Sequence, residues 1–376
     1  RSYWSGSDLT QKRDRRYVID LYGLTLDEAR ARYPAALNHL AAHVLPERQH
    51  NRDATFREKW WIFGRPRPEL RAANAGIPRY IVTSEVSKHR IFTFLRWPDE
   101  LIDGSVIAIA LADAYALGVV SSRAHTVWAL AAGGRLESRP RYQNELCFDP
   151  FPFPAASRPL KQRIGDLAEQ LDAHRKRQQE KHPDLTVTAM YNVLAKLRAN
   201  APLTAKEQTT HDQGLVSALR QLHDELDGAV FDAYEWPSKM SDEEIVERLV
   251  QLNAHRTAEE VQGNIRWLRP EFQNPSGVVA AVQSPLSELG AEHVATAPRG
   301  GVARVRPWPK ALPDRIAAVR AAVRMHGDAV TVADVRRMFL RAPARDVGVA
   351  LDTLASLGIL IRYGAENARR WKAPSA

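Results

Sequence analysis

Residues 133–142 read Gly-Gly-Arg-Leu-Glu-Ser-Arg-Pro-Arg-Tyr, and residues 147–154, a few positions later, read Cys-Phe-Asp-Pro-Phe-Pro-Phe-Pro. The second stretch cannot continue a helix or a central strand, because each proline removes a backbone donor. We therefore expect it to be extended, with its aromatic rings packed on a neighbouring domain. Together the two stretches indicate the end of one module and the beginning of a helical domain.

Upstream of this boundary, strand-like and helix-like segments alternate. Runs rich in β-branched and aromatic residues predict strands at 16–22, 79–83, 91–95 and 106–111. Thr25 and Glu28 have the spacing of a capping box, which predicts a helix to about residue 45 with a break at Pro34. Residues 121–132 are also expected to be helical. The fold class of residues 1–154 is therefore α+β, a mixed α/β domain.

Downstream, apolar residues recur at helical spacing. They predict helices over 160–171, 185–198 and 215–234, and a capping box from Ser241 to Glu244 predicts another. Residues 155–272 are thus expected to form an α-helical middle domain. Residues 273–312 are rich in Pro, Gly, Ser and Ala, which is typical of a linker.

The last segment, residues 313–376, has a distinct order of elements. Helices are expected over 312–325, from Thr331 to 339, and over 344–357, where Gly358 ends the third. Two strands follow, at 359–363 and 369–372. Three helices and a β-hairpin predict a C-terminal winged helix-turn-helix.

Bulk properties exclude several classes of protein. The chain has 376 residues and a single cysteine, Cys147, so no disulfide framework is available and no cysteine-based zinc site can form. No apolar run approaches the roughly 20 residues of a membrane span, and no signal peptide begins the chain. These features favour a reduced, cytoplasmic setting without a membrane partner. Because the chain begins at Arg1, we expect it to be a piece of a longer polypeptide or a processed subunit.

Charge is unevenly distributed. Residues 1–154 carry 22 Lys+Arg against 17 Asp+Glu, residues 155–298 carry 16 against 21, and residues 299–376 carry 15 against 6. Two basic ends therefore flank an acidic middle, within an overall net charge of +9. Basic regions attract nucleic-acid backbones, although a solvated surface gives the same pattern.

Motifs for chemistry are absent. The sequence contains no phosphate-binding glycine loop and no dinucleotide fingerprint. His39 and His43 are four residues apart but lack the glutamate of a metalloprotease helix, so we expect neither a metal site nor catalytic residues. Residues 274–277 read Asn-Pro-Ser-Gly, which lacks the second proline and the aromatic ring that amino-methyltransferases use to hold a flipped base.

Candidate binding residues remain. Arginines and lysines interleave with Trp60, Trp61 and Phe63, which fits phosphate gripping or, alternatively, a packed tryptophan pair with solvated charges. The run from Lys88 to Arg90 lies between two predicted strands. It is either a loop whose side chains enter a DNA groove or a charged hairpin turn. Glu137 can accept a hydrogen bond from cytosine and Arg139 can donate to guanine, so the two could read one C·G pair. A local ion pair is the alternative.

A series of short motifs, in this order and spacing, resembles the C-terminal half of large DNA adenine-N6 methyltransferases of the type IIL, type IIG-like restriction-modification group. The adenine methyltransferase of DISARM phage-defence systems is similar. The matching motifs cover about residues 1–275 and occupy 3–9, 60–64, 78–81, 86–90, 121–125, 134–139, 151–154, 249–253 and 265–271.

The resemblance implies that residues 1–154 form a target recognition domain for duplex DNA, followed by helices. Another domain, in the same polypeptide or in a partner chain, would bind S-adenosylmethionine, so no residue of this chain would hold that cofactor. By resemblance, Glu137 and Arg139 read one base pair, and loop 84–90 and turn 103–105 lie near other reading positions. The base-reading candidates are Glu137, Arg139, Lys88, His89, Arg90 and Ser105; the backbone-contact candidates are Arg52, Arg57, Lys59, Arg65, Arg67, Ser122, Arg123, His125, Arg135, Arg141 and Arg345.

Two departures keep other interpretations open. The catalytic motifs of the family are missing from this sequence, and a winged helix is not a general feature of the family. A DNA-binding scaffold or regulator in a defence complex is the main alternative, and a nuclease subunit of a restriction system is another. Other subunits of such a system would then be partners.

Overall fold

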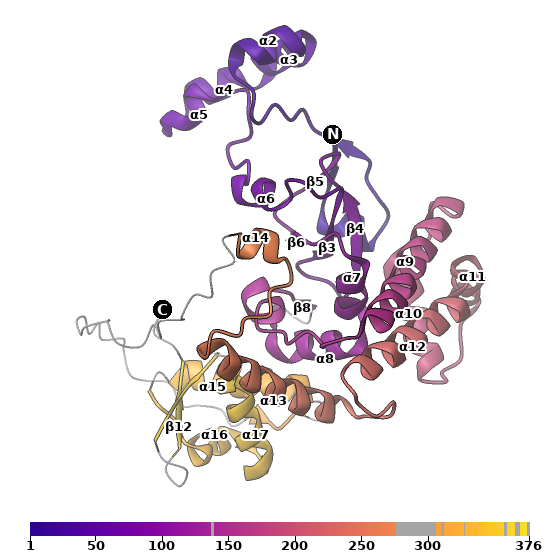
Figure 1. The fold of residues 1–376 in the computed structure, drawn as a ribbon, viewed down its shortest axis with the longest axis vertical. Coiled ribbons are helices and arrows are strands. Elements are labelled where there is room, and N and C mark those ends of the chain that lie inside the picture. Colours follow the sequence, from indigo (N-terminus) through magenta and orange to yellow (C-terminus); the bar gives the residue numbers. More distant parts are fainter. Residues whose placement is uncertain are drawn as a thin grey trace. The chain divides into compact units, whose positions relative to one another are not determined.

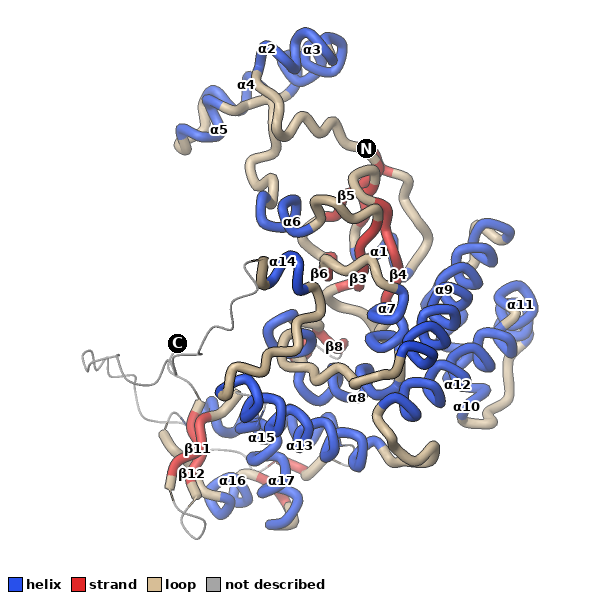
Figure 2. The backbone as a smooth tube through the Cα atoms, viewed as in Figure 1, coloured by secondary structure: helices blue, strands red, loops and turns tan. Residues whose placement is uncertain are grey.

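The computed structural model describes residues 1–136, 139–275, 306–309, 312–326, 328–356, 359–364 and 369–373 (Figure 1). The chain forms two compact units. The first unit comprises Arg1–Ser84 and Thr93–Ala112, and the second comprises Glu85–Phe92 and Asp113–Ala376. The mixture of helices and small sheets confirms the predicted α+β class (Figure 2).

The first unit contains two three-stranded sheets and several short helices. One sheet has the order β2-β1-β5 and the other has the order β4-β3-β6. The strands are β1 (Ser2–Trp4), β2 (Arg16–Tyr17), β3 (Arg79–Ser84), β4 (Phe92–Arg96), β5 (Glu100–Ile102) and β6 (Val106–Ile109). The helices are α1 (Gly6–Thr10), α2 (Leu26–Arg32), α3 (Pro34–His43), α4 (Leu45–Gln49), α5 (Ala54–Glu58) and α6 (Pro68–Ala73).

Local signals explain most of these elements. Thr25 and Glu28 form the predicted capping box, and Pro34 starts a new helix at the predicted break. The predicted strand at 16–22 is wrong beyond Tyr17, because Leu21 instead enters a small core with Ala29 and Leu37. The predicted strands near 80, 93 and 107 are confirmed as β3, β4 and β6.

The second unit is mainly helical (Figures 1 and 2). It begins with α7 (Ala114–Ser121), α8 (Arg123–Ala132), the hairpin β7 (Gly134–Leu136) and β8 (Arg139–Arg141), and the π-helix η1 (Asn144–Phe148). The long helices are α9 (Arg158–Lys181), α10 (Val187–Arg198), α11 (Ala205–Gly214), α12 (Val216–Ala233) and α13 (Asp242–Val261), followed by the short α14 (Pro270–Gln273). The sequence reading missed α11, whose apolar face is weak.

Residues 147–154, the Phe-Pro stretch, lead from the π-helix η1 toward α9. Residues 147–148 are π-helical and residues 149–150 form a turn, so the expected extended conformation is wrong there; residues 151–154 lie in neither a helix nor a strand. Phe151 is 5% exposed and its ring lies 4.4 Å from that of His125 and 5.9 Å from that of Trp128. The hydroxyls of Tyr115 and Tyr234 donate to the carbonyls of Pro154 and Pro152. The stretch therefore packs against α7, α8 and α12.

In the C-terminal part, the described residues form the helices α15 (Leu312–His326), α16 (Val332–Arg337) and α17 (Ala344–Ser356). Strands β11 (Ile361–Tyr363) and β12 (Arg370–Lys372) pair antiparallel, and β9 (Arg306–Pro307) pairs with β10 (Phe339–Leu340). The predicted helices and returning strand are thus present; Gly358 lies outside the described residues, as does most of the predicted linker. A single cluster of buried apolar residues includes Ile91, side chains of the long helices and Trp371.

Candidate nucleic-acid interface

The hairpin that carries Arg139 is built by the glycine pair. Strands β7 and β8 pair antiparallel with Gly134 opposite Arg141 and Leu136 opposite Arg139. A Cβ atom at position 133 would lie 2.6 Å from the Ala129 carbonyl oxygen and 2.7 Å from that of Arg141. Only glycine therefore lets the hairpin leave helix α8 at this point. Glu137 and Ser138, which connect the strands, lie outside the described residues, as does the side chain of Arg135.

The segment Glu85–Phe92 lies along the same hairpin. The Tyr142 amide donates to the Glu85 carbonyl at 2.7 Å, and the Ser87 amide donates to the Pro140 carbonyl at 3.3 Å. The Arg141 guanidinium also contacts the Glu85 carboxylate at 2.7 Å. Two predicted base-reading segments, separated by about fifty residues in sequence, are therefore held side by side within one unit.

The side chain of Arg90 also links the Glu85–Phe92 segment to the hairpin. Its guanidinium donates to the Pro140 carbonyl at 3.3 Å and lies over the Tyr142 ring at 5.0 Å. Burial lowers the pKa of Arg90 to about 10, so the side chain stays charged at neutral pH. These contacts give Arg90 a bracing position, whereas Lys88 and Arg139 are exposed on the surface.

His125 and Ser122 occupy interior positions, which corrects their expected contact with the DNA backbone. Both are 0% exposed. His125 Nε2 lies 2.9 Å from the Tyr142 hydroxyl, and the Ser122 hydroxyl donates to the Val119 carbonyl. Burial lowers the pKa of His125 to about 3, so the ring is neutral. Neither side chain can reach a phosphate without unfolding this core.

Arg123 is engaged within the second unit. Its guanidinium contacts Asp242 at 2.6 Å, and its amide donates to Asp227 at 2.6 Å. Arg141 is similarly paired with Glu85. Arg345 is exposed near the start of α17. A phosphate contact by Arg123 or Arg141 would therefore compete with an existing carboxylate.

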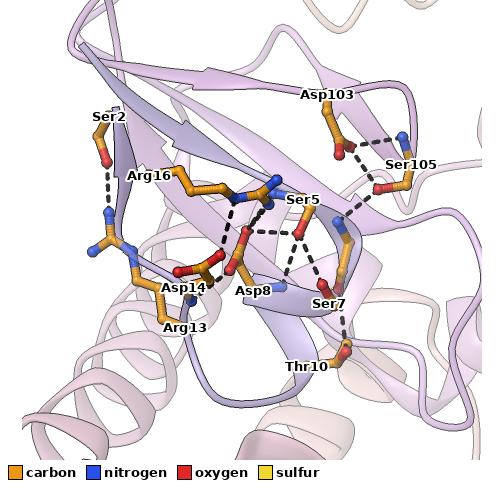
Figure 3. A network of polar contacts seen from close by, with 11 residues as sticks. Ser2, Ser5, Ser7, Asp8, Thr10, Arg13, Asp14, Arg16, Asp103 and Ser105 are labelled. Atoms are coloured by element: carbon orange, nitrogen blue, oxygen red, sulfur yellow. Dashed lines mark hydrogen bonds and ion pairs between the residues drawn. The ribbon is translucent and has the colours of Figure 1, made fainter. Parts of the chain in front are cut away.

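Ser105 belongs to the first unit, where a polar network fixes its turn (Figure 3). Its hydroxyl donates to Asp103 at 2.6 Å and accepts from the Gly6 amide at 2.8 Å. A Cβ atom at position 6 would lie 2.8 Å from the Ser105 carbonyl oxygen. The glycine in the motif at 3–9 therefore permits this close approach.

Asp8 organises the other side of that network. Burial raises the pKa of its carboxyl, but hydrogen bonds from Ser5, Asp14 and Arg16 outweigh burial and lower it overall. Asp8 thus stays ionised and, with Ser5, forms a capping box at the start of α1. The sequence reading overlooked this box, although Ser5 and Asp8 have the required spacing.

The remaining basic candidates of the first unit line its surface. Arg52, Arg57, Lys59 and Arg65 are exposed, and the Arg67 guanidinium donates to the Asp103 carbonyl at 3.0 Å. Arg65 and Arg67 also border a cavity of about 270 Å³, together with Tyr3, Trp97 and Asp103. The tryptophan pair is packed edge to face, and the Trp61 ring nitrogen donates to the Leu24 carbonyl. The rings therefore anchor the segment that presents the arginines.

The sequence did not reveal two residues that contact the candidate loop and the base of the hairpin. Asn192 of α10 accepts hydrogen bonds from Lys88 and His89. Arg320 of α15 donates to the Ala132 carbonyl at 3.3 Å, next to the start of the hairpin. No sequence pattern marks either contact, because each joins segments about one hundred residues or more apart.

Neither a membrane-spanning helix nor a metal-binding group is found in the described residues. None of the described helices is long and apolar enough to cross a bilayer. Likewise, histidine, cysteine and carboxylate side chains do not gather in threes within the described ranges.

Comparison with known proteins places the first part of the chain in a family context. Residues 1–155 match the model of the MmeI target recognition domain. DNA methyltransferase A of Bacillus subtilis (strain 168) is 29% identical over 180 residues, which cover 47% of this chain and 18% of that protein. The match therefore spans less than a fifth of the curated relative.

A solved structure of the type IIL restriction-modification enzyme MmeI in complex with DNA has the same fold over 69% of this chain and 31% of that chain. The TM-score is 0.50 and the identity is 20%. The matched region thus extends beyond the recognition domain but spans only about a third of that enzyme. The resemblance expected from the sequence is confirmed: residues 1–155 are similar to the target recognition domain of MmeI, a type IIL restriction-modification enzyme.

Proposed function

We propose that this chain is the part of a type IIL methyltransferase-like system that recognises a specific sequence in duplex DNA. The observation that carries the proposal is the surface formed by Lys88 and Arg139, on segments joined by backbone hydrogen bonds. Both lie within the residues that match a target recognition domain. Exposed cationic donors on a fixed backbone suit contact with base edges in a groove.

Within this proposal, Glu137 and Arg139 read one base pair, and Ser105 reads another position. The exposed basic side chains of the first unit contact phosphates, namely Arg52, Arg57, Lys59 and Arg65, and so does the half-buried Arg67 beside the cavity. Phosphate contacts supply affinity without sequence information, so they position the reading surface. Arg345 adds a contact from the C-terminal part, which we propose to be a winged helix.

The chemistry is proposed to reside outside this chain. A domain in the same polypeptide or a partner chain would bind S-adenosylmethionine and methylate adenine at N6. The setting would be a cytoplasmic restriction-modification or DISARM-type antiviral defence system. The support is the similarity to a DNA methyltransferase and to a type IIL enzyme, together with the lack of a nucleotide fingerprint in this sequence.

Exchange of the two charges tests the base-reading role. In the intact methyltransferase that carries this chain, we expect the double variant Glu137→Lys, Arg139→Asp to methylate a motif changed at one base pair. The exchange keeps the net charge, so attraction to the DNA backbone is preserved. The methylated motif is measured by sequencing genomic DNA from cells that express each variant.

A variant that retained the original motif would contradict the base-reading role. Arg345→Ala serves as the control, because loss of a phosphate contact weakens binding uniformly and reduces its salt dependence without changing the motif. The alternative of a non-enzymatic scaffold predicts that no methylation depends on this chain at all.

A further inference from the structure

Helix α10 of the second unit meets the Glu85–Phe92 segment through Asn192, whose side chain contacts two residues of that segment. The Lys88 ammonium donates to Asn192 Oδ1 at 2.7 Å, and His89 Nε2 lies 2.9 Å from the same oxygen. Asn192 lies about one hundred residues beyond the segment that it contacts. An amide from the helical part is thus built into a predicted base-reading loop.

The chemistry of the three groups fixes which amide atom of Asn192 faces Lys88 and His89. An ammonium can only donate, so the amide atom that faces Lys88 must be the oxygen. Burial lowers the pKa of His89, which favours the neutral ring. Because the shared amide oxygen can only accept, Nε2 carries the ring proton and donates a hydrogen bond to it. The Asn192 amide nitrogen then has two donors, and neither is satisfied by the part of the chain that the structure describes.

Buried contacts hold both sides of this cluster. The His89 ring lies 5.9 Å from that of Tyr191, and the Ser87 hydroxyl donates to the His89 carbonyl. Beneath it, the buried Arg175 donates to the Phe92 carbonyl at 2.7 Å and to the Tyr191 hydroxyl at 3.3 Å. A donor cluster held in this way loses little conformational entropy on binding.

We infer that Asn192 and Lys88 form a composite contact for the major-groove edge of one guanine. This inference rests on the proposed function. Guanine presents two acceptors there, N7 and O6, which match outward donors from an ammonium and an amide. Adenine and cytosine each present an amino group, which is a donor and would face the donors of Lys88 and Asn192. Thymine presents a methyl group beside its single acceptor. The helical part of the chain therefore contributes directly to base reading.

Two variants separate base contact from mere support of Lys88. Asn192→Asp keeps an oxygen for Lys88 and His89 but lacks the outward amide donors, and Asn192→Leu removes both. The intact methyltransferase, wild type and variants, is used to select binding sites from a randomised duplex library. We expect both variants to lose about ten- to a hundredfold discrimination for guanine at one position, with the remaining motif unchanged.

The controls make failure informative. Gln208→Leu replaces an exposed amide of α11 whose partners among the described residues, His211 and Asp212, belong to the same helix, and the selected motif should stay the same. Thermal unfolding of each variant shows that it is folded. Selection of the wild-type motif by both variants overturns the inference, and so does its retention by Asn192→Asp alone, which would make Asn192 only a support. Failure of the wild type to select any motif overturns the proposed function and this inference together.

Discussion

Two buried histidines of the second unit stabilise the fold only while their rings are neutral. His125 lies beside the Tyr142 hydroxyl, and His223 Nε2 lies 2.7 Å from the Tyr191 hydroxyl. Burial lowers the pKa of each ring to about 3, whereas an unfolded histidine titrates near 6.5. Protonation of either ring would place an uncompensated charge in the core.

This burial predicts loss of stability in acid. Because the unfolded state binds the proton first, the contribution is fully present above pH 6.5 and is lost as the pH falls toward 3. Between pH 7 and pH 5 each histidine should cost about 2 kcal/mol of unfolding free energy. Urea unfolding at the two pH values measures this, and His223→Gln should show the smaller loss.

Asp227 acts in the opposite direction and must be considered in that comparison. Burial raises the pKa of its carboxyl from 3.8 to about 6, so its contribution rises as the pH falls through this window. Asp227 is the same in wild type and variant, so the difference between them isolates His223. An identical loss in both proteins would show that His223 is already charged or exposed.

Helices α7 and α9 approach closely at Gly118. A Cβ atom there would lie 2.5 Å from Ile164 Cγ2 and 2.9 Å from the Ile164 carbonyl oxygen. The second neighbour is backbone and cannot rotate away, so the helices would have to separate. The Phe-Pro stretch also packs against α7, through the hydrogen bond from Tyr115 to Pro154.

Substitution of this glycine should therefore destabilise the protein. We expect Gly118→Ala to cost about 1–3 kcal/mol through overpacking. The matched control is Gly228→Ala in α12, where a Cβ atom meets nothing within 4 Å. That change should stabilise the helix by about 0.5–1 kcal/mol. Denaturant unfolding gives both values, and equal effects at the two sites would refute the close approach.

At the scale of the whole molecule, the second unit shares one apolar core between its middle and C-terminal parts. Ile316, Val319 and Leu351 belong to the same cluster as Trp128 and Leu226. Arg320 adds a hydrogen bond from α15 to the end of α8. The sequence predicts a separate domain over residues 313–376, and this stays a prediction.

Removal of the C-terminal part tests the shared core. A chain that ends after residue 273 should lose several buried side-chain contacts, each worth about 1.5–3 kcal/mol. Its Tm should fall by roughly 10 °C or more, and its exposed core should promote aggregation. Scanning calorimetry against the full chain measures this. An unchanged unfolding transition would instead establish residues 313–376 as an independent domain.

The sequence by itself determined the elements whose signals are local. Thr25, Ser241 and Thr331 each start a helix through a capping box, and Pro34 divides one, because these effects involve residues three or four apart. The helix-and-strand order of the C-terminal part followed from periodicity for the same reason. The match to a recognition domain also rested on ordered short motifs.

Only the tertiary structure decided which segments meet and which side chains are buried. The sequence could not show that His125 points into the core, since a histidine on a helix suits either the core or the surface. Nor could it show that α10 places Asn192 against Lys88, because that contact depends on how helices α9, α10 and α12 pack. Base reading needs donors fixed in space, and their positions come from packing across the chain rather than from neighbouring residues.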